Sequence, residues 1–275
     1  MTTNHDLVLH HLQTLFSRIR EAVLSQPPDR PAGRLGRNAK GDPVKWFDLA
    51  ADEVVSRYLA EEFPWPVRLL SEEGTPREYG RGAPEFVMVL DPVDGSENFA
   101  RRISPSGTAM ALIPAGQPVN IRTVEYALVG QLFTGQTWTA RRGGGAFLDG
   151  RPIPPAPPVA LEQAIISFDT NRSVAPPALM AVLSRALGVR SFAAAAVVLA
   201  MVAGGTLGAH IDLTGNLTPE NFLASALLIT ETGGRVTAAD GQPLPDIDTL
   251  TQGYRLVAAA TPSLHDALVA GLAGK

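Results

Sequence analysis

The feature that most constrains this chain is a strand-forming run, residues 85–90, that leads directly into a turn crowded with carboxylates. The stretch FVMVLDPVDGSENF places Asp91 and Asp94 three residues apart and follows them with Gly95 and Ser96. Strand ends are where α/β folds place their sites. Two like charges this close repel each other unless a positive group lies between them. The sequence therefore predicts a buried strand whose end binds something positively charged.

The composition is that of an ordinary globular protein. Of 275 residues, 45% are hydrophobic and 18% are charged. The formal net charge of −4 does not indicate the basic surface that nucleic-acid binding usually requires, so we expect no nucleic-acid partner. The absence of cysteine excludes disulfides, zinc–thiolate sites and cysteine nucleophiles. It also fits a reducing compartment, and together with an N-terminus that lacks the signal-peptide pattern it predicts a cytoplasmic location.

One uncharged segment, residues 192–209, has the length of a membrane span. Gly204 and Gly205 interrupt this segment and alanine dominates it. This pattern favours a buried helix of about twelve residues that ends at the glycine pair, followed by a strand. We therefore expect no membrane partner.

The pattern of apolar residues divides the chain into two halves. Apolar positions recur with helical spacing over residues 6–25 and 48–63. Short apolar runs between Gly, Pro and Asn turns then predict an antiparallel sheet. Beyond the proline-rich stretch 151–160, strand and helix patterns alternate, which indicates an α/β arrangement. We expect an N-terminal α+β half, 1–150, that carries the acidic turn, and a C-terminal half, 151–275, that contributes substrate-side residues.

The loop 27–43 between the first two helices is rich in Pro and Gly and carries four basic residues, with Lys45 just beyond it. Two interpretations stay open. The loop is either a solvated surface segment or a flap that approaches an anionic ligand.

Acidic residues follow two strands of the N-terminal half. Glu72 follows one strand, and Asp91 and Asp94 follow the next. Oxygen ligands without His or Cys favour a hard cation, which indicates Mg²⁺ or Mn²⁺ rather than zinc. Converging carboxylates can hold two such ions about 3.5–4 Å apart for phosphate ester hydrolysis. The amides of Gly95 and Ser96 would open a short helix that binds an anion, and the other interpretation is a plain turn.

These residues resemble the signature of the inositol monophosphatase family of Mg²⁺-dependent, Li⁺-sensitive phosphatases. That signature reads D-P-[IVL]-D-G-[TS]-x-N-F, and DPVDGSENF matches it throughout. The segments GDPVKWFDLAADE, LLSEEG, GGGAFLDGRPI and LLITETGGRV resemble other motifs of the family, so the resemblance covers nearly the whole chain. Two features, DPVKxxD and NFARRISP, favour the archaeal-type inositol monophosphatase and fructose-1,6-bisphosphatase-like relatives.

The resemblance implies an α/β protein layered as an α-β-α-β-α sandwich. It also implies a phosphoric monoester hydrolase that binds one to three Mg²⁺ ions, or Mn²⁺ in their place. Carboxylates at the strand ends would bind metal, a carboxylate and a hydroxyl would orient and deprotonate the attacking water, and backbone amides would hold phosphate. The implied catalytic residues are Asp48, Glu72 and Ser96, the metal ligands are Glu72, Asp91, Val93 (through its carbonyl), Asp94 and Asn221, and the phosphate-binding residues are Gly95 and Ser96.

Two positions depart from the family pattern. The third carboxylate of the second metal site falls on Asn221, whose amide oxygen ligates a hard cation but lacks the charge. Glu220 and Asp212 are the candidates for compensation. The acid that contacts substrate hydroxyls in relatives falls near Val198, which cannot accept a hydrogen bond. The remaining candidates for the substrate side are Asp169, Asn171, Arg172 and Arg190.

The sequence therefore predicts metal-dependent hydrolysis of a small phosphorylated metabolite, an inositol phosphate or a sugar phosphate. Two alternatives stay open. One is a phosphatase of different specificity, acting on a nucleotide 3′-phosphate or a sugar bisphosphate. The other is a catalytically weakened relative that binds a phosphorylated ligand or a protein partner. The resemblance also implies a homodimer.

Overall fold

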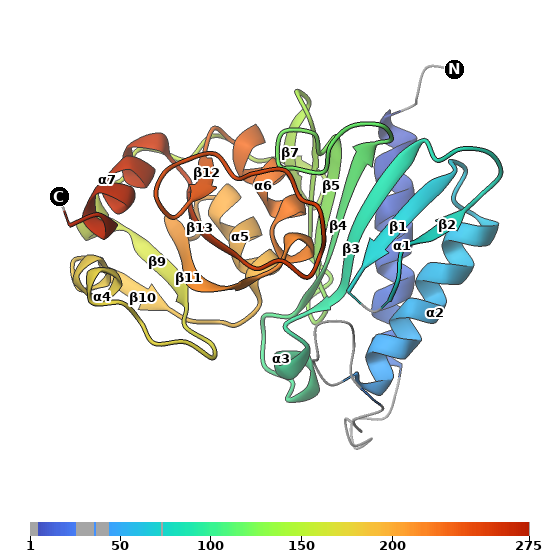
Figure 1. Cartoon of the computed structure of the whole chain (residues 1–275), viewed down its shortest axis with the longest axis horizontal. Coiled ribbons are helices and arrows are strands. Elements are labelled where there is room, and N and C mark those ends of the chain that lie inside the picture. The colour runs from blue at the N-terminus through green and yellow to red at the C-terminus, as the bar shows by residue number, and fades with distance from the viewer. Residues whose placement is uncertain (1–4, 26–35, 37–43, 73, 275) are drawn as a thin grey trace.

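The structure, a computed structural model, describes residues 5–25, 36, 44–72 and 74–274. Its helices and sheets alternate in five layers, α-β-α-β-α, and Figure 1 shows the larger sheet beside α1 and α2 and the smaller sheet beside α7. The expected fold class is therefore confirmed. The helices are α1 (His5–Leu24), α2 (Trp46–Glu61), α3 (Ser96–Ala100), α4 (Pro177–Leu183), α5 (Ala195–Ala203), α6 (Leu223–Glu231) and α7 (Pro262–Leu272).

The first sheet has eight strands in the order β2-β1-β3-β4-β5-β6-β7-β8. Neighbours in it are antiparallel, as expected, except that β1 and β3 run parallel. The short strand β2 separates them in the sequence, which the sequence pattern did not predict. Its strands are β1 (Val67–Ser71), β2 (Arg77–Tyr79), β3 (Phe86–Asp94), β4 (Gly107–Pro114), β5 (Tyr126–Gln131), β6 (Thr137–Arg141), β7 (Gly145–Leu148) and β8 (Arg151–Pro152).

The first two helices cover the outer face of this sheet. The residues spaced for one helix face are buried in α1, among them Val8, Leu12 and Phe16. They pack against alternate residues of β3, such as Met88 and Leu90, in one apolar cluster. The alternation of side chains along a strand sends the intervening residues to the opposite face of the sheet. Both N-terminal helices are thus confirmed.

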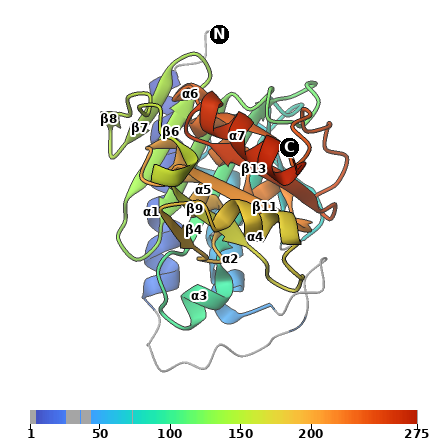
Figure 2. The ribbon, with the colours of Figure 1, turned by 90° about the vertical axis from the view of Figure 1, so that its left-hand side faces the viewer.

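The second sheet is mixed, with strand order β10-β9-β11-β13-β12. β10, β9 and β11 are parallel, whereas β13 is antiparallel to both of its neighbours. Figure 2 shows α4 and α7 in front of this sheet, on its outer face. Its strands are β9 (Ile165–Asp169), β10 (Gly188–Arg190), β11 (Ala209–Leu217), β12 (Arg235–Ala238) and β13 (Tyr254–Ala259). The division of the chain at residue 150 stays a prediction.

The central layer consists of α5 and α6, which lie between the two sheets. Val197 and Leu227 of these helices share one apolar cluster with Val89 of the first sheet and Leu256 of the second. The alanine-rich helix is therefore a core element that ends before Gly204 and is followed by a strand, as predicted. Within the described residues, no helix is long and apolar enough to cross a membrane.

The start of α2 differs from the expectation. α2 begins at Trp46, two residues early, because Asp48 accepts a hydrogen bond from the backbone N–H of the N-cap residue Lys45. Thr218 precedes only a 3₁₀ turn, Pro219–Asn221, and α6 begins at Leu223. The basic loop 27–43 lies outside the described residues, and the expectations for it stay open.

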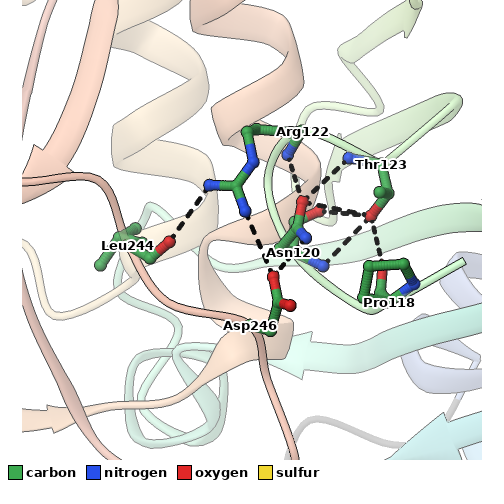
Figure 3. Close-up of polar contacts among 6 residues, drawn as sticks. All are labelled: Pro118, Asn120, Arg122, Thr123, Leu244 and Asp246. Atoms are coloured by element: carbon green, nitrogen blue, oxygen red, sulfur yellow. Dashed lines mark hydrogen bonds and ion pairs between the residues drawn. The ribbon is translucent and has the colours of Figure 1, made fainter.

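A polar latch joins the loop after β4 to the long loop between β12 and β13 (Figure 3). Asp246 accepts hydrogen bonds from the buried Asn120 amide at 2.6 Å and from the Arg122 guanidinium at 3.2 Å. Beside this pair, the Ile247 N–H donates to the carbonyl of Val119 at 2.8 Å. The latch therefore connects a loop of the first sheet to a loop of the second.

We expect Asp246→Ala to destabilise the protein by about 1–3 kcal/mol, because it leaves the buried Asn120 amide without its acceptor. Thermal unfolding would show this as a drop in Tm of a few degrees. The matched control is Glu162→Ala, which removes an exposed ion pair with Arg185 (2.8 Å) and should change Tm little, because solvent screens such pairs. Equal effects of the two substitutions would show that the latch stabilises the protein no more than an exposed ion pair does.

Candidate active site

The parallel pairing of β1 and β3 creates the site. Ser71, the last residue of β1, lies opposite Leu90 in β3, so Glu72 and Asp91 leave the two strands at the same edge. The pairing of β3 with β4 shifts register between Asp91 and Asp94, which bends the strand end. Beside this edge lies a cavity of about 460 Å³.

The cavity brings together nearly all the residues that the sequence nominated. Arg190 is the exception, because it sits on the edge strand β10 and its guanidinium donates to the Val189 carbonyl at 2.8 Å. The nominated residues that line the cavity are Asp48, Glu72, Asp91, Val93, Asp94, Gly95, Ser96, Asp169, Asn171, Arg172 and Asn221. Those that the sequence did not nominate as catalytic or substrate-side are Lys45, Glu97, Ala193, Ala195, Asp212, Thr214, Asn216 and Leu217.

Asp94 is held at the bottom of the site by the first turn of α5. Its Oδ2 accepts hydrogen bonds from the N–H groups of Ala196 (3.0 Å) and Val197 (3.3 Å). Burial raises the pKa of Asp94 to about 7, although these amides act in the opposite direction. The positive end of the α5 dipole therefore only partly offsets the cost of burying this carboxylate.

Gly95 cannot be another residue without moving the start of α5. It has φ of 72° at the N-cap of α3, and a Cβ there would come within 2.9 Å of the Ala194 Cβ. The turn with the acidic motif thus packs directly against the C-terminal half of the chain.

Asp48 and Ser96 face the cavity from different elements and share one neighbour, Lys45. The Lys45 backbone N–H donates to Asp48 Oδ2 at 2.7 Å, and its Nζ donates to Ser96 Oγ at 3.0 Å. Burial raises the pKa of Asp48 to about 6. Glu97 forms an ion pair with Lys45 Nζ at 2.8 Å. Hydrogen bonds from Lys45 and Arg101 lower the pKa of Glu97 to about 2.

The opposite end of the cavity is formed by strand ends of the second sheet. Asp169 of β9 lies opposite Asp212 of the parallel strand β11. Asp212 is buried, accepts the N–H (2.8 Å) and hydroxyl (2.7 Å) of Thr214, and has its pKa raised by burial to about 6. The rule that located Asp91, an acid at the end of a predicted strand, applies equally to Asp212.

Comparisons with known proteins agree with this geometry. A family model described as the inositol monophosphatase family matches residues 6–274. The chain belongs to the inositol monophosphatase family.

Individual relatives show the same likeness over nearly their whole lengths. A fructose-1,6-bisphosphatase/inositol-1-monophosphatase of Methanothermobacter thermautotrophicus is 31% identical over 93% of this chain and 92% of its own. An inositol-1-monophosphatase of Bacillus subtilis is 26% identical over 82% and 81%. A solved inositol monophosphatase–fructose 1,6-bisphosphatase superposes with a TM-score of 0.80 over 98% of this chain and all of its own, at 22% identity. This chain is accordingly a metal-dependent phosphoric monoester hydrolase.

The departure from the inositol monophosphatase pattern at Asn221 has a definite geometry. Its Nδ2 donates to Asp91 Oδ2 at 2.6 Å, and its Oδ1 lies 3.0 Å from the hydroxyl of Thr218. The amide thus presents hydrogens to Asp91, the carboxylate that the resemblance assigns to metal binding. Glu220, a candidate for compensation, is buried beside Thr218 (2.5 Å) and does not line the cavity.

The second departure was located wrongly. Val198 is buried within α5 in the central apolar cluster and does not line the cavity, so it does not occupy a substrate-side position. The residues that do face this end come from β9, β11 and the loops that follow them.

The side chains that line the cavity include the oxygen ligands that Mg²⁺ or Mn²⁺ requires. Glu72, Asp91 and Asp94 are oxygen donors, and the two aspartates are nearly inaccessible, at 2% and 4% exposed. Buried carboxylates of this kind favour a hard divalent cation. Across the described part of the chain, however, no three acidic or histidine side chains are gathered closely enough to surround an ion. Asp91 instead accepts a hydrogen bond from Asn221, and Asp94 accepts hydrogen bonds from the first turn of α5.

We expect Asp94→Asn to raise Tm above pH 7 when the chain is kept free of divalent ions. The pKa of Asp94 rises from 3.8 to about 7 on folding, so wild-type stability falls as pH rises through that window. Asparagine carries no charge and still offers an oxygen to the α5 amides. Thermal unfolding in EDTA at pH 5 and pH 8 measures the effect, with the exposed Asp240→Asn as control. If the Tm of the variant fell with pH as steeply as that of the wild type, Asp94 would not be the group that causes the loss of stability.

Proposed function

We propose that the chain hydrolyses an inositol phosphate or sugar phosphate monoester with Mg²⁺, or with Mn²⁺ in its place. One observation carries the proposal: a single cavity is lined both by the carboxylates Glu72, Asp91 and Asp94 and by the pair Asp48 and Ser96. Three carboxylates would hold metal, with help from the Val93 carbonyl and the Asn221 amide oxygen. The other pair would activate water. The homodimer and the cytoplasmic location belong to the same proposal and rest on the resemblance and the composition alone.

The reaction requires a water molecule and one proton acceptor. Asp48 and Ser96 would take a proton from the water as its oxygen bonds to phosphorus. The ester P–O bond breaks, and the departing oxygen takes up a proton and leaves as the alcohol, with inorganic phosphate as the second product. The N–H groups of Gly95 and Ser96 would hold phosphate oxygens. When bound, Mg²⁺ supplies positive charge that acidifies water and stabilises the charge on the phosphoryl group.

The far end of the cavity suits a polyhydroxylated leaving group. Asp169 and Asp212 can accept hydrogen bonds from hydroxyls, and Asn171 and Asn216 can both donate and accept. Arg172 adds a cation there, which would also suit a second phosphate. The Methanothermobacter relative is named for both a bisphosphatase and a monophosphatase activity. The sugar bisphosphate alternative therefore remains a second candidate, and turnover on inositol 1-phosphate, fructose 1,6-bisphosphate and a nucleotide 3′-phosphate would rank the three.

We expect Asp91→Asn to lower kcat on inositol 1-phosphate by about 10³-fold or more, because the site would lose a carboxylate that both metal positions use. Steady-state kinetics at saturating Mg²⁺ would measure this loss. Asp240→Asn, on an exposed loop, should match the wild type. Wild-type turnover in Asp91→Asn would show that the metal assignment is wrong.

The role of Asn221 is tested by restoring the charge. We expect Asn221→Asp to tighten Mg²⁺ binding about tenfold, because a carboxylate replaces the amide that faces Asp91. Isothermal titration with MgCl₂ would give the affinity and the number of ions, and kinetics would give the accompanying gain in kcat. A weakly active wild type that becomes fast in this variant would favour the catalytically weakened alternative. Unchanged binding would show that Asn221 already ligates as well as an acid.

A further inference from the structure

Lys45 is an unusual residue in this chain. The sequence contains 20 arginines but only three lysines, and the other two, Lys40 and Lys275, lie outside the described residues. Lys45 is only 4% exposed, although lysine is rarely buried without a partner. A compact ammonium at this position contrasts with the guanidinium groups that the chain uses elsewhere.

The ammonium is fixed by two partners on consecutive residues of α3. It donates to Ser96 Oγ at 3.0 Å and forms an ion pair with Glu97 Oε1 at 2.8 Å. Arg101 contacts the same Glu97 carboxylate from the next turn of the helix. The aromatic ring of Phe47 lies 5.6 Å from the Nζ. These contacts hold the ammonium in one place and neutralise its charge.

The backbone of the same residue fixes Asp48. The Lys45 N–H donates to Asp48 Oδ2 at 2.7 Å, and among the described residues no hydrogen bond to Oδ1 is formed, so Oδ1 is the more available oxygen to receive a proton from the site. One residue thus orients a carboxylate through its backbone and a hydroxyl through its side chain, and both groups line the same cavity.

The direction of the Ser96 hydroxyl follows from this arrangement. A hydroxyl has one hydrogen and two lone pairs. Lys45 donates to Ser96 Oγ and cannot accept, so one lone pair is used and the Ser96 hydrogen must point elsewhere. The second lone pair is then available to accept a proton from water, and the hydrogen is available for transfer to Asp48, which lines the same cavity.

We propose that Lys45 is a positioning residue that makes Ser96 a one-way proton relay from the attacking water to Asp48. The water O–H bond breaks as its proton moves to Ser96 Oγ, and the proton already on Ser96 moves to Asp48 Oδ1. Ser96 is left as a hydroxyl and Asp48 as a carboxylic acid, which later releases the proton to solvent. The inference rests on the proposed roles of Asp48 and Ser96.

The rival explanation is that Lys45 binds the phosphate itself, because it lines the cavity and an ammonium has a third donor. The ion pair with Glu97 favours positioning, since a cation already neutralised by a carboxylate attracts an anion less strongly. If Lys45 bound phosphate, removing its ammonium would weaken the affinity for substrate and product. If Lys45 positions Ser96, removing its ammonium would slow only the chemical step.

The test is Lys45→Met, which preserves side-chain length and the backbone N–H but removes the donor. We expect kcat to fall about 10²-fold, the scale of acid–base assistance, with KM and the affinity for inorganic phosphate in saturating Mg²⁺ within about twofold of the wild type. Isothermal titration with inorganic phosphate measures that affinity. A rise in KM and a loss of phosphate binding at unchanged kcat would overturn the proposal in favour of the rival.

A double-mutant cycle with Ser96→Ala separates this inference from the proposed function. If Lys45 acts through Ser96, Lys45→Met will cost nothing further in the Ser96→Ala background. Additive losses would overturn the positioning role while leaving the function intact. Wild-type activity in Ser96→Ala alone would instead contradict the proposed role of Ser96.

The matched control is Arg77→Met, which removes a half-buried cation paired with Asp52 on the same helix, α2, outside the cavity. It should lower Tm without changing kcat. If Lys45→Met does not fold, Glu97→Gln replaces it, because Glu97 is 60% exposed and only anchors the ammonium. We expect a several-fold loss of kcat that disappears in the Ser96→Ala background, and an unchanged kcat would overturn the proposal.

Discussion

The site depends on how buried negative charge is tolerated at the end of β3. Asp91 and Asp94 are almost inaccessible, and each is stabilised by groups from elsewhere in the chain: the Asn221 amide for one and the α5 amides for the other. Neutral donors relieve such a charge only in part, which is visible in the raised pKa of Asp94. The same deficit of positive charge makes this edge suitable for a divalent cation. The same buried carboxylates therefore destabilise the unliganded protein and increase its affinity for metal.

The two sheets contribute unequal parts of the chemistry. The first sheet brings the motif acids together through one parallel strand pair in an otherwise antiparallel arrangement. The second sheet supplies the polar groups at the far end of the cavity, again from neighbouring parallel strands. In both sheets the acids lie where the pairing of two parallel strands ends, after Ser71 and Leu90 in the first sheet and at Asp169 and Asp212 in the second. The proposed reaction centre and the proposed substrate end therefore both depend on a pair of parallel strands.

The sequence predicted the layers and the motif acids because these depend on local patterns. Helical spacing buried Val8 and Leu12 as expected, and the glycine pair after α5 ended a core helix as expected. The prediction failed where position depends on distant contacts. Val198 was placed at the substrate side by counting from a motif, but α5 buries it between the sheets. Arg190 was nominated as a substrate-side residue and lies on an exposed edge strand.

Lys45 illustrates a different limit. Its sequence neighbourhood resembles a basic loop, and only the start of α2 at Trp46 turns it into a helix cap with a buried ammonium. Asp212 was considered only as a metal substitute, although it ends a predicted strand. Its partner Asp169 was nominated, and the parallel register of β9 and β11 makes the two neighbours. Register of this kind cannot be read from one strand at a time.

The contact between the motif turn and the start of α5 has a consequence for biosynthesis. Asp94 and its amide partner Ala196 are separated by 102 residues, and Asp91 and Asn221 by 130. While the chain is being made, the acidic motif emerges long before the groups that satisfy it. Loops of this length must close before their contacts contribute any stability, which slows folding. The nascent first half would therefore carry its future reaction centre as an unsatisfied, charged edge, and only synthesis of the second half would convert that edge into a closed pocket.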